Sequence, residues 1–169
     1  RMTKLIIVGA GGHGREMLWV AQRCGMDVLG FLVDGNDHKG TTINNIAVLG
    51  DIDEWQKYAD AEFIIAIGSP RNRKSVYDRM LKHGQPRFAT LIDPTAMVAE
   101  SASVGAGSMS SPGAIISVAA SLGQHVIGNI NSSVSHYARV VNFVTVAIGF
   151  SIFGSVIVDI GVHFGASNE

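Results

Sequence analysis

The second half of the chain carries one residue placed to move a proton, His136, within NSSVSHYARV at 131–140. A neutral imidazole can take a proton from an amine or hydroxyl that attacks a thioester, and backbone N–H groups can hold the resulting oxyanion. His136 lies two residues after an inward position of the repeat described below, so we expect it to point outward. The alternative is a surface histidine without a chemical role.

A glycine-rich loop is the second feature that could do chemistry. GAGGHG at 9–14 fits G-x-G-x-x-G between an apolar run at 4–8 and a helical pattern. Glycines there let the backbone approach a phosphate at a helix N-terminus, and the acidic residue expected about twenty positions later is Asp34. His13 could contact a phosphate or a base, or it could be solvated. Read literally, this pattern indicates dinucleotide binding; a tight turn without a ligand is the alternative.

A second strand-to-helix junction, IGSPRNRK at 67–74, follows the same logic. We expect it at the carboxyl edge of the sheet together with the glycine loop, where open α/β sheets bind ligands. Ser69 is a plausible helix cap, and Arg73 could meet a phosphate. Ordinary surface charge at the start of a helix explains the same residues equally well.

The elements that position these loops alternate between strand and helix. The pattern predicts strands at 4–8, 27–34, 62–68 and 87–92, and helices at 14–25, 51–59 and 71–84. This order predicts a Rossmann-like parallel α/β sheet.

The charged residues divide the chain near Pro94. Residues 1–97 hold 12 of the 13 Lys and Arg residues and 11 of the 14 Asp and Glu residues. We therefore expect two domains, 1–93 and 94–169.

The second domain repeats every six residues. Steps of six from Val98 to Phe164 give twelve positions, of which ten are apolar, and smaller residues recur four places later, from Ala102 to Asn168. A hexapeptide period predicts a parallel β-helix, in which three hexads form one triangular coil. A β-sandwich with a period of two is the alternative. The repeat stops inside the solenoid at Glu169, so we interpret this domain as truncated.

Composition limits the function classes. The formal net charge of −1 favours neither nucleic acid nor an anionic membrane as partner, and no apolar run is long enough to span a bilayer. The single cysteine, Cys24, excludes an internal disulfide or thiolate metal cage and fits a cytoplasmic protein. Metal binding has no support in the sequence.

Taken together, LIIVGAGGHGRE, GFLVD, FIIAIGSPRNRKSVY, LIDPTAMV and the hexads resemble bacterial sugar acetyltransferases of the sialic-acid O-acetyltransferase and UDP-4-amino-sugar (bacillosamine) N-acetyltransferase type. The resemblance covers nearly the whole chain. It implies a left-handed β-helix, a homotrimer and acetyl transfer from acetyl-CoA to a sugar amine or hydroxyl.

The resemblance also implies roles for individual residues. A UDP-sugar would bind at Gly11, Gly12 and His13, with Asp34 and the Gly68–Ser69 turn nearby. His136 matches the catalytic base and Asn129 an active-site asparagine. Thr145 and Gly149 would line the acetyl-CoA groove.

One departure from the family affects the base directly. Family members usually carry an acidic residue after the catalytic histidine, whereas this chain has Tyr137. Two other functions stay open: a non-catalytic trimeric scaffold that binds a nucleotide sugar and, with less support, an NAD-dependent oxidoreductase.

Overall fold

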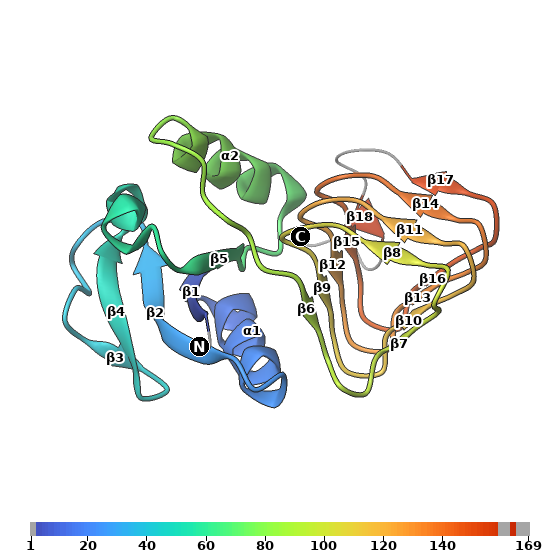
Figure 1. The fold of residues 1–169 in the computed structure, drawn as a ribbon, viewed down its shortest axis with the longest axis horizontal. Coiled ribbons are helices and arrows are strands. Elements are labelled where there is room, and N and C mark those ends of the chain that lie inside the picture. The colour runs from blue at the N-terminus through green and yellow to red at the C-terminus, as the bar shows by residue number, and fades with distance from the viewer. Residues whose placement is uncertain (1–2, 159–162, 165–169) are drawn as a thin grey trace. The chain divides into compact units, whose positions relative to one another are not determined.

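The computed structural model describes residues 3–158 and 163–164. The described chain forms two compact units: one holds residues 3–68 and 72–89, and the other holds residues 69–71, 90–158 and 163–164. The first unit is built on a parallel sheet and the second on stacked short strands (Figure 1). Each unit is described separately below.

The sheet of the first unit has the order β3-β4-β2-β1-β5. Its strands and helices are β1 (Lys4–Val8), α1 (Gly12–Arg23), β2 (Asp27–Val33), β3 (Thr42–Ile43), β4 (Ile46–Asp51), the 3₁₀ helix η1 (Ile52–Tyr58), β5 (Glu62–Ile65) and α2 (Pro70–Leu81). β1 pairs in parallel with both β2 and β5, and β2 pairs in parallel with β4. The strand order therefore reverses between β1 and β5, which is the switch point where open α/β sheets bind ligands.

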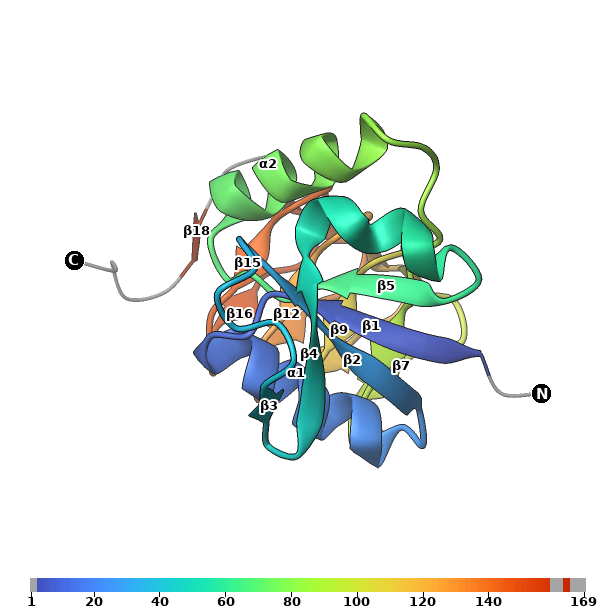
Figure 2. The ribbon, with the colours of Figure 1, turned by 90° about the vertical axis from the view of Figure 1, so that its left-hand side faces the viewer.

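Alternation along the strands produces two buried faces. Ile6 and Val8 of β1 pack with η1 and α2 through Trp55 and Met80, whereas Leu5 and Ile7 point to the other face by the period of two. Figure 2 shows α1 and α2 on opposite sides of the sheet. The short apolar runs of the sequence are thus strands buried on both faces, as parallel strands require.

Two predicted elements of this unit differ from the structure. The segment 51–59 forms a 3₁₀ helix, whose first turn is fixed by a capping box between Asp51 and Glu54. The antiparallel β3–β4 pair was not predicted from the sequence. Its two-residue turn is Asn44–Asn45, both with positive φ, and asparagine tolerates this left-handed backbone better than most residues.

The predicted strand at 87–92 is wrong as one element of the first sheet. Phe88 forms only an isolated parallel bridge to Phe63, and Ala89 N–H donates to the Phe63 carbonyl. Leu91–Ile92 instead forms β6, which pairs with a strand of the second unit. The run is divided because its two ends find hydrogen-bond partners in different sheets.

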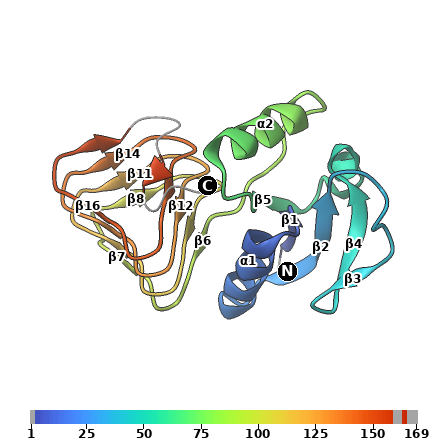
Figure 3. The same cartoon turned by 180° about the vertical axis from the view of Figure 1, so that it is seen from behind.

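The second unit is a left-handed parallel β-helix of two-residue strands (Figure 3). The strands are β6 (Leu91–Ile92), β7 (Met97–Val98), β8 (Ser103–Val104), β9 (Met109–Ser110), β10 (Ile115–Ile116), β11 (Ser121–Leu122), β12 (Ile127–Gly128), β13 (Ser133–Val134), β14 (Arg139–Val140), β15 (Thr145–Val146), β16 (Ser151–Ile152), β17 (Ile157–Val158) and β18 (His163–Phe164). They form three sheets, β16-β13-β10-β7, β17-β14-β11-β8 and β18-β15-β12-β9-β6. Each strand pairs with the strand 18 residues away, as Ile116 does with Val134.

The hexad pattern predicts this core. The second residue of each strand points inward, and Ile116, Leu122, Val134 and Val140 belong to one buried cluster. The smaller series contributes Ala114, Ala120, Val126 and Ala138, all buried. Val162 and Asn168 of that series lie outside the described residues.

From residue 107 to residue 155, each hexad turns its corner through a residue in the left-handed conformation. Positive φ recurs every six residues from Gly107 through Gly113 and then at Ala119, His125, Asn131, Tyr137, Phe143, Gly149 and Ser155. Glycine and asparagine take this conformation at low cost, whereas the bulky residues in the series do so against their intrinsic preference. The repeat of the β-helix thus imposes a left-handed backbone conformation on Tyr137, the residue directly after His136.

Candidate functional site

Two glycines build the loop between β1 and α1. Gly9 has a φ of +105°, and a Cβ there would lie 3.0 Å from the Ala66 carbonyl oxygen. A Cβ on Gly14 would lie 2.2 Å from the Gly9 carbonyl oxygen. Both neighbours are backbone atoms that no rotamer change can move. Gly9 and Gly14 are therefore needed for the turn itself, and Gly9 brings the loop against the segment that follows β5.

Three other glycines leave space open. A Cβ on Gly11, Gly12 or Gly68 would meet nothing within 4 Å. Gly11 is the N-cap of α1 and offers no side-chain cap, and the first turn of that helix has no acidic residue. The helix N-terminus therefore presents backbone N–H groups and a partial positive charge to an open surface, which suits a phosphate group.

His13 lies on the first turn of α1 as a neutral imidazole. Burial, and then the positive charge of Arg73, lowers the pKa of His13 to about 4. Its Nε2 atom is buried without a hydrogen-bond partner, as is Oε1 of Glu16 one helical turn later. Glu16 was not among the residues predicted from the sequence, because no glycine-loop pattern requires an acid there. A ligand group that hydrogen-bonds to His13 Nε2 would satisfy one of these atoms.

Arg73 supports the turn after β5. Its guanidinium Nη1 donates to the carbonyl oxygens of Ile67 at 2.6 Å and Gly68 at 3.2 Å, and the side chain is fully buried. Burial lowers its pKa to about 10, so it remains charged at neutral pH. The sequence reading of Arg73 as a phosphate contact therefore gives way to a position beneath the Gly68–Ser69 turn, whose shape it holds.

Asp34 follows β2, as the fingerprint predicts, but its carboxylate already has a partner. Arg79 of α2 bonds to Asp34, Asp51 and Asp53. The hydrogen bond to Asp53, followed by that to Asp34, raises the pKa of Arg79. Because the Asp34 side chain is 80 % exposed, it can still accept hydrogen bonds from a ligand while Arg79 holds it in place.

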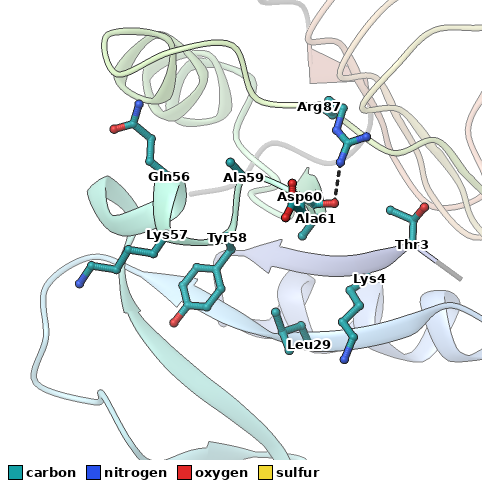
Figure 4. Close-up of a pocket in the computed structure, with 10 residues that line it drawn as sticks. All are labelled: Thr3, Lys4, Leu29, Gln56, Lys57, Tyr58, Ala59, Asp60, Ala61 and Arg87. Atoms are coloured by element: carbon teal, nitrogen blue, oxygen red, sulfur yellow. Dashed lines mark hydrogen bonds between the residues drawn. The ribbon is translucent and has the colours of Figure 1, made fainter. Parts of the chain in front are cut away.

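An open groove of about 710 Å³ lies at the opposite, amino edge of the sheet (Figure 4). Lys4 at the start of β1, Lys57, Tyr58 and Arg87 line it, and Arg87 donates to the Asp60 carbonyl oxygen at 2.5 Å. Its position separates this groove from the glycine loop, so it belongs to neither of the predicted sites.

His136 stands on a corner of the β-helix, directly after β13. Its side chain is exposed, and its Nδ1 lies 3.3 Å from the hydroxyl oxygen of Ser135. The Tyr137 ring meets the imidazole edge-on, with ring centroids 6.1 Å apart. The backbone is held from both adjacent coils, because Ser155 N–H donates to the His136 carbonyl and Tyr137 N–H donates to the Val118 carbonyl. The outward direction predicted from the hexad is correct.

Asn129, Thr145 and Gly149 gather around the β12–β15 side of the coil. Asn129 Nδ2 donates to the Val146 carbonyl oxygen at 2.9 Å, and Gly149 N–H donates to the Ile130 carbonyl. Thr145 is buried, whereas Gly149 is exposed with a φ of +67°. His136 lies after the next strand, β13, so one chain distributes these four residues over two successive sides of the coil.

No helix in residues 3–158 is long and apolar enough to cross a membrane. Within the same residues, no three His, Cys, Asp or Glu side chains gather as a metal site would require.

Known proteins resemble this chain over nearly its whole length. The PglD N-terminal domain family matches residues 4–80. The GDP-perosamine N-acetyltransferase of Escherichia coli O157:H7 is 29 % identical over 166 residues, covering 95 % of this chain and 74 % of that protein. The chain is therefore similar to bacterial sugar N-acetyltransferases over nearly its whole length.

Solved structures show the same fold. The acetyltransferase domain of PglB from Neisseria gonorrhoeae, in complex with acetyl coenzyme A, superposes with a TM-score of 0.79 at 25 % identity, covering 89 % of this chain and 73 % of that one. PerB from Caulobacter crescentus, in complex with CoA and GDP-perosamine, shares the fold with a TM-score of 0.70 at 20 % identity, over 94 % and 93 % of the two chains.

Proposed function

We propose that this protein transfers the acetyl group of acetyl-CoA to an amino group of a nucleotide-linked sugar, with His136 as general base. One observation carries the proposal: His136 is an exposed imidazole on a β-helix corner, in a chain similar over 95 % of its length to a sugar N-acetyltransferase. The open loop at Gly11 and Gly12 supports a nucleotide diphosphate as the handle of the substrate.

The reaction needs one proton acceptor and no metal. The sugar amine attacks the thioester carbonyl, forming the C–N bond, while its proton passes to Nε2 of His136. The C–S bond then breaks, and the imidazolium returns the proton to the departing CoA sulfur. The imidazole ends neutral, so His136 is ready for another cycle.

The nucleotide portion is assigned to the first unit. Gly11, Gly12 and Gly68 would surround the diphosphate, with His13 as a neutral hydrogen-bonding partner. Asp34 would accept hydrogen bonds from ribose hydroxyls. The resemblance points to a UDP-sugar and the named relatives to a GDP-sugar, so experiment must decide between uracil and guanine as the nucleobase of the substrate.

A homotrimer would complete the acetyl-CoA site. Asn129, Thr145 and Gly149 lie around a different side of the coil from His136, which supports a site shared by neighbouring subunits. The acetyl-CoA donor and the single cysteine support a cytoplasmic location.

The experiment is acetyl transfer with UDP- and GDP-linked 4-amino sugars, followed by CoA thiol release. We expect turnover with one nucleotide and a roughly 10²- to 10⁴-fold loss for His136→Ala, with nucleotide affinity unchanged. Unchanged turnover in that variant would remove His136 from its role.

A non-catalytic, nucleotide-sugar-binding scaffold is the second candidate, favoured by Tyr137 in place of the family's acid. Nucleotide binding without acetyl transfer to any amino or hydroxyl sugar would support it. The named relatives are acetyltransferases, which favours acetyl transfer over the oxidoreductase alternative.

A further inference from the structure

We propose that Ser135 and Gly154 position the His136 imidazole: Ser135 holds Nδ1, and Gly154 keeps the space at Nε2 open. The activity readout of this inference rests on the proposed function, whereas its spectroscopic readout does not. Neither residue belongs to the glycine loop or to the residues assigned to acetyl-CoA.

The Gly154 contact follows from the coil. Residues 118, 136 and 154 are 18 apart and therefore occupy one corner of successive coils, as Val118, His136 and Gly154. A Cβ on Gly154 would lie 2.6 Å from Nε2 of His136 and 2.8 Å from its Cε1. The first side-chain atom of any other residue would therefore occupy the space that the ring edge and an approaching amine need.

Gly154 is needed for space rather than for backbone conformation. Its φ is not in the left-handed region, unlike that of Gly149. An L-residue could adopt this backbone without strain, and the three atoms nearest to its Cβ would all belong to the His136 imidazole. Steric access at Nε2 is therefore the physical reason for a glycine here.

Ser135 acts on the other ring nitrogen. Its Oγ lies 3.3 Å from Nδ1, and its backbone is fixed because Ser135 N–H donates to the Ile152 carbonyl. When Nδ1–H donates to this hydroxyl, the lone pair is left on Nε2, which is the tautomer a base needs. The same oxygen accepts a hydrogen bond from the imidazolium that forms during the reaction. In this chain the Ser135 hydroxyl, directly before His136, thus orients the imidazole, a role that we assign in family members to the acidic residue directly after the histidine.

The test combines two variants with a matched control. Ser135→Ala removes the hydrogen bond, and we expect kcat to fall about 3- to 10-fold with KM for the nucleotide sugar unchanged. Gly154→Ala displaces the ring, and we expect kcat to fall on the order of 100-fold. The control is Gly123→Ala, where a Cβ would lie 2.5 Å from Asn142 Oδ1 and 2.9 Å from the Asn142 backbone nitrogen, a collision away from His136. It should lose stability but keep kcat per folded molecule.

Nitrogen-15 NMR of the histidine rings tests the arrangement without turnover. We expect wild-type His136 to carry its proton on Nδ1, Ser135→Ala to mix the tautomers, Ser135→Thr to restore the wild-type spectrum, and Gly154→Ala to shift the His136 signals. Wild-type-like His136 signals in Gly154→Ala, or a proton on Nε2 in the wild type, would overturn the inference. Absent acetyl transfer in a wild type with the expected NMR pattern would instead refute the proposed function alone.

Discussion

Two glycines of the loop, Gly12 and Gly14, should respond differently to alanine: one substitution should weaken ligand binding and the other should destabilise the fold. Gly14→Ala would place its Cβ 2.2 Å from the Gly9 carbonyl oxygen. Since both contacting groups are backbone, the helix must move away from β1, and overpacking of this kind costs about 3 kcal/mol of unfolding free energy. Gly12→Ala meets nothing within 4 Å, and alanine in a helix stabilises by up to ~0.5 kcal/mol relative to glycine.

Ligand binding should reverse this order of severity. A methyl group at Gly12 keeps a phosphate from the exposed N–H groups of α1, and losing one or two charge-assisted hydrogen bonds weakens binding roughly 10- to 100-fold. Urea denaturation gives the stability, and isothermal titration with UDP and GDP gives the affinity. A Gly12→Ala protein that binds nucleotide like wild type, or a Gly14→Ala protein of unchanged stability, would refute our assignment of the two glycine classes.

Two further predictions concern single residues. The pKa of His13 is about 4 in the folded chain, against an ordinary 6.5, so the unfolded chain takes up the proton first as the pH falls. The contribution of His13 to the free energy of unfolding is therefore complete above pH 6.5 and is lost by pH 4, a loss of roughly 2–3 kcal/mol. Denaturation curves at pH 7.5 and 4.5 should therefore differ less in His13→Gln than in wild type, and an equal difference would contradict the neutral, buried imidazole. Tyr137 has a φ of +57°, so Tyr137→Asn should raise the unfolding free energy by about 1 kcal/mol; a decrease would mean that the ring contact with His136 outweighs the backbone strain.

Much of the second unit follows from the sequence because the chain there repeats every six residues, and the hexads predict which residues point inward. In the first unit, strands that alternate with helices predict a parallel sheet but not its strand order. The β3–β4 hairpin was missed because β3 has only two residues, although Asn44–Asn45 between apolar residues is a recognisable turn signal. The run at 87–92 could not be divided from sequence, because hydrogen-bond partners in two different sheets decide it.

The site was predictable in its residue types and less so in its contacts. The burial of Arg73 depends on how α2 packs, which no local pattern encodes. The contact between His136 and Gly154 is different, because three hexads make one coil and a step of 18 residues leads directly from one to the other. A repeat of known period thus predicts lateral neighbours as well as the core.

Acetyl transfer itself is the most direct test. Labelled acetyl-CoA would be incubated with UDP- and GDP-linked 4-amino sugars and either wild-type protein or His136→Ala, and N-acetylated sugar would be detected by mass spectrometry. We predict product from wild type with one of the two nucleotides, and product reduced by at least about 100-fold in the variant. Equal product from both proteins, or none from wild type while nucleotide still binds, would contradict the assignment of His136 as the base of a sugar N-acetyltransferase.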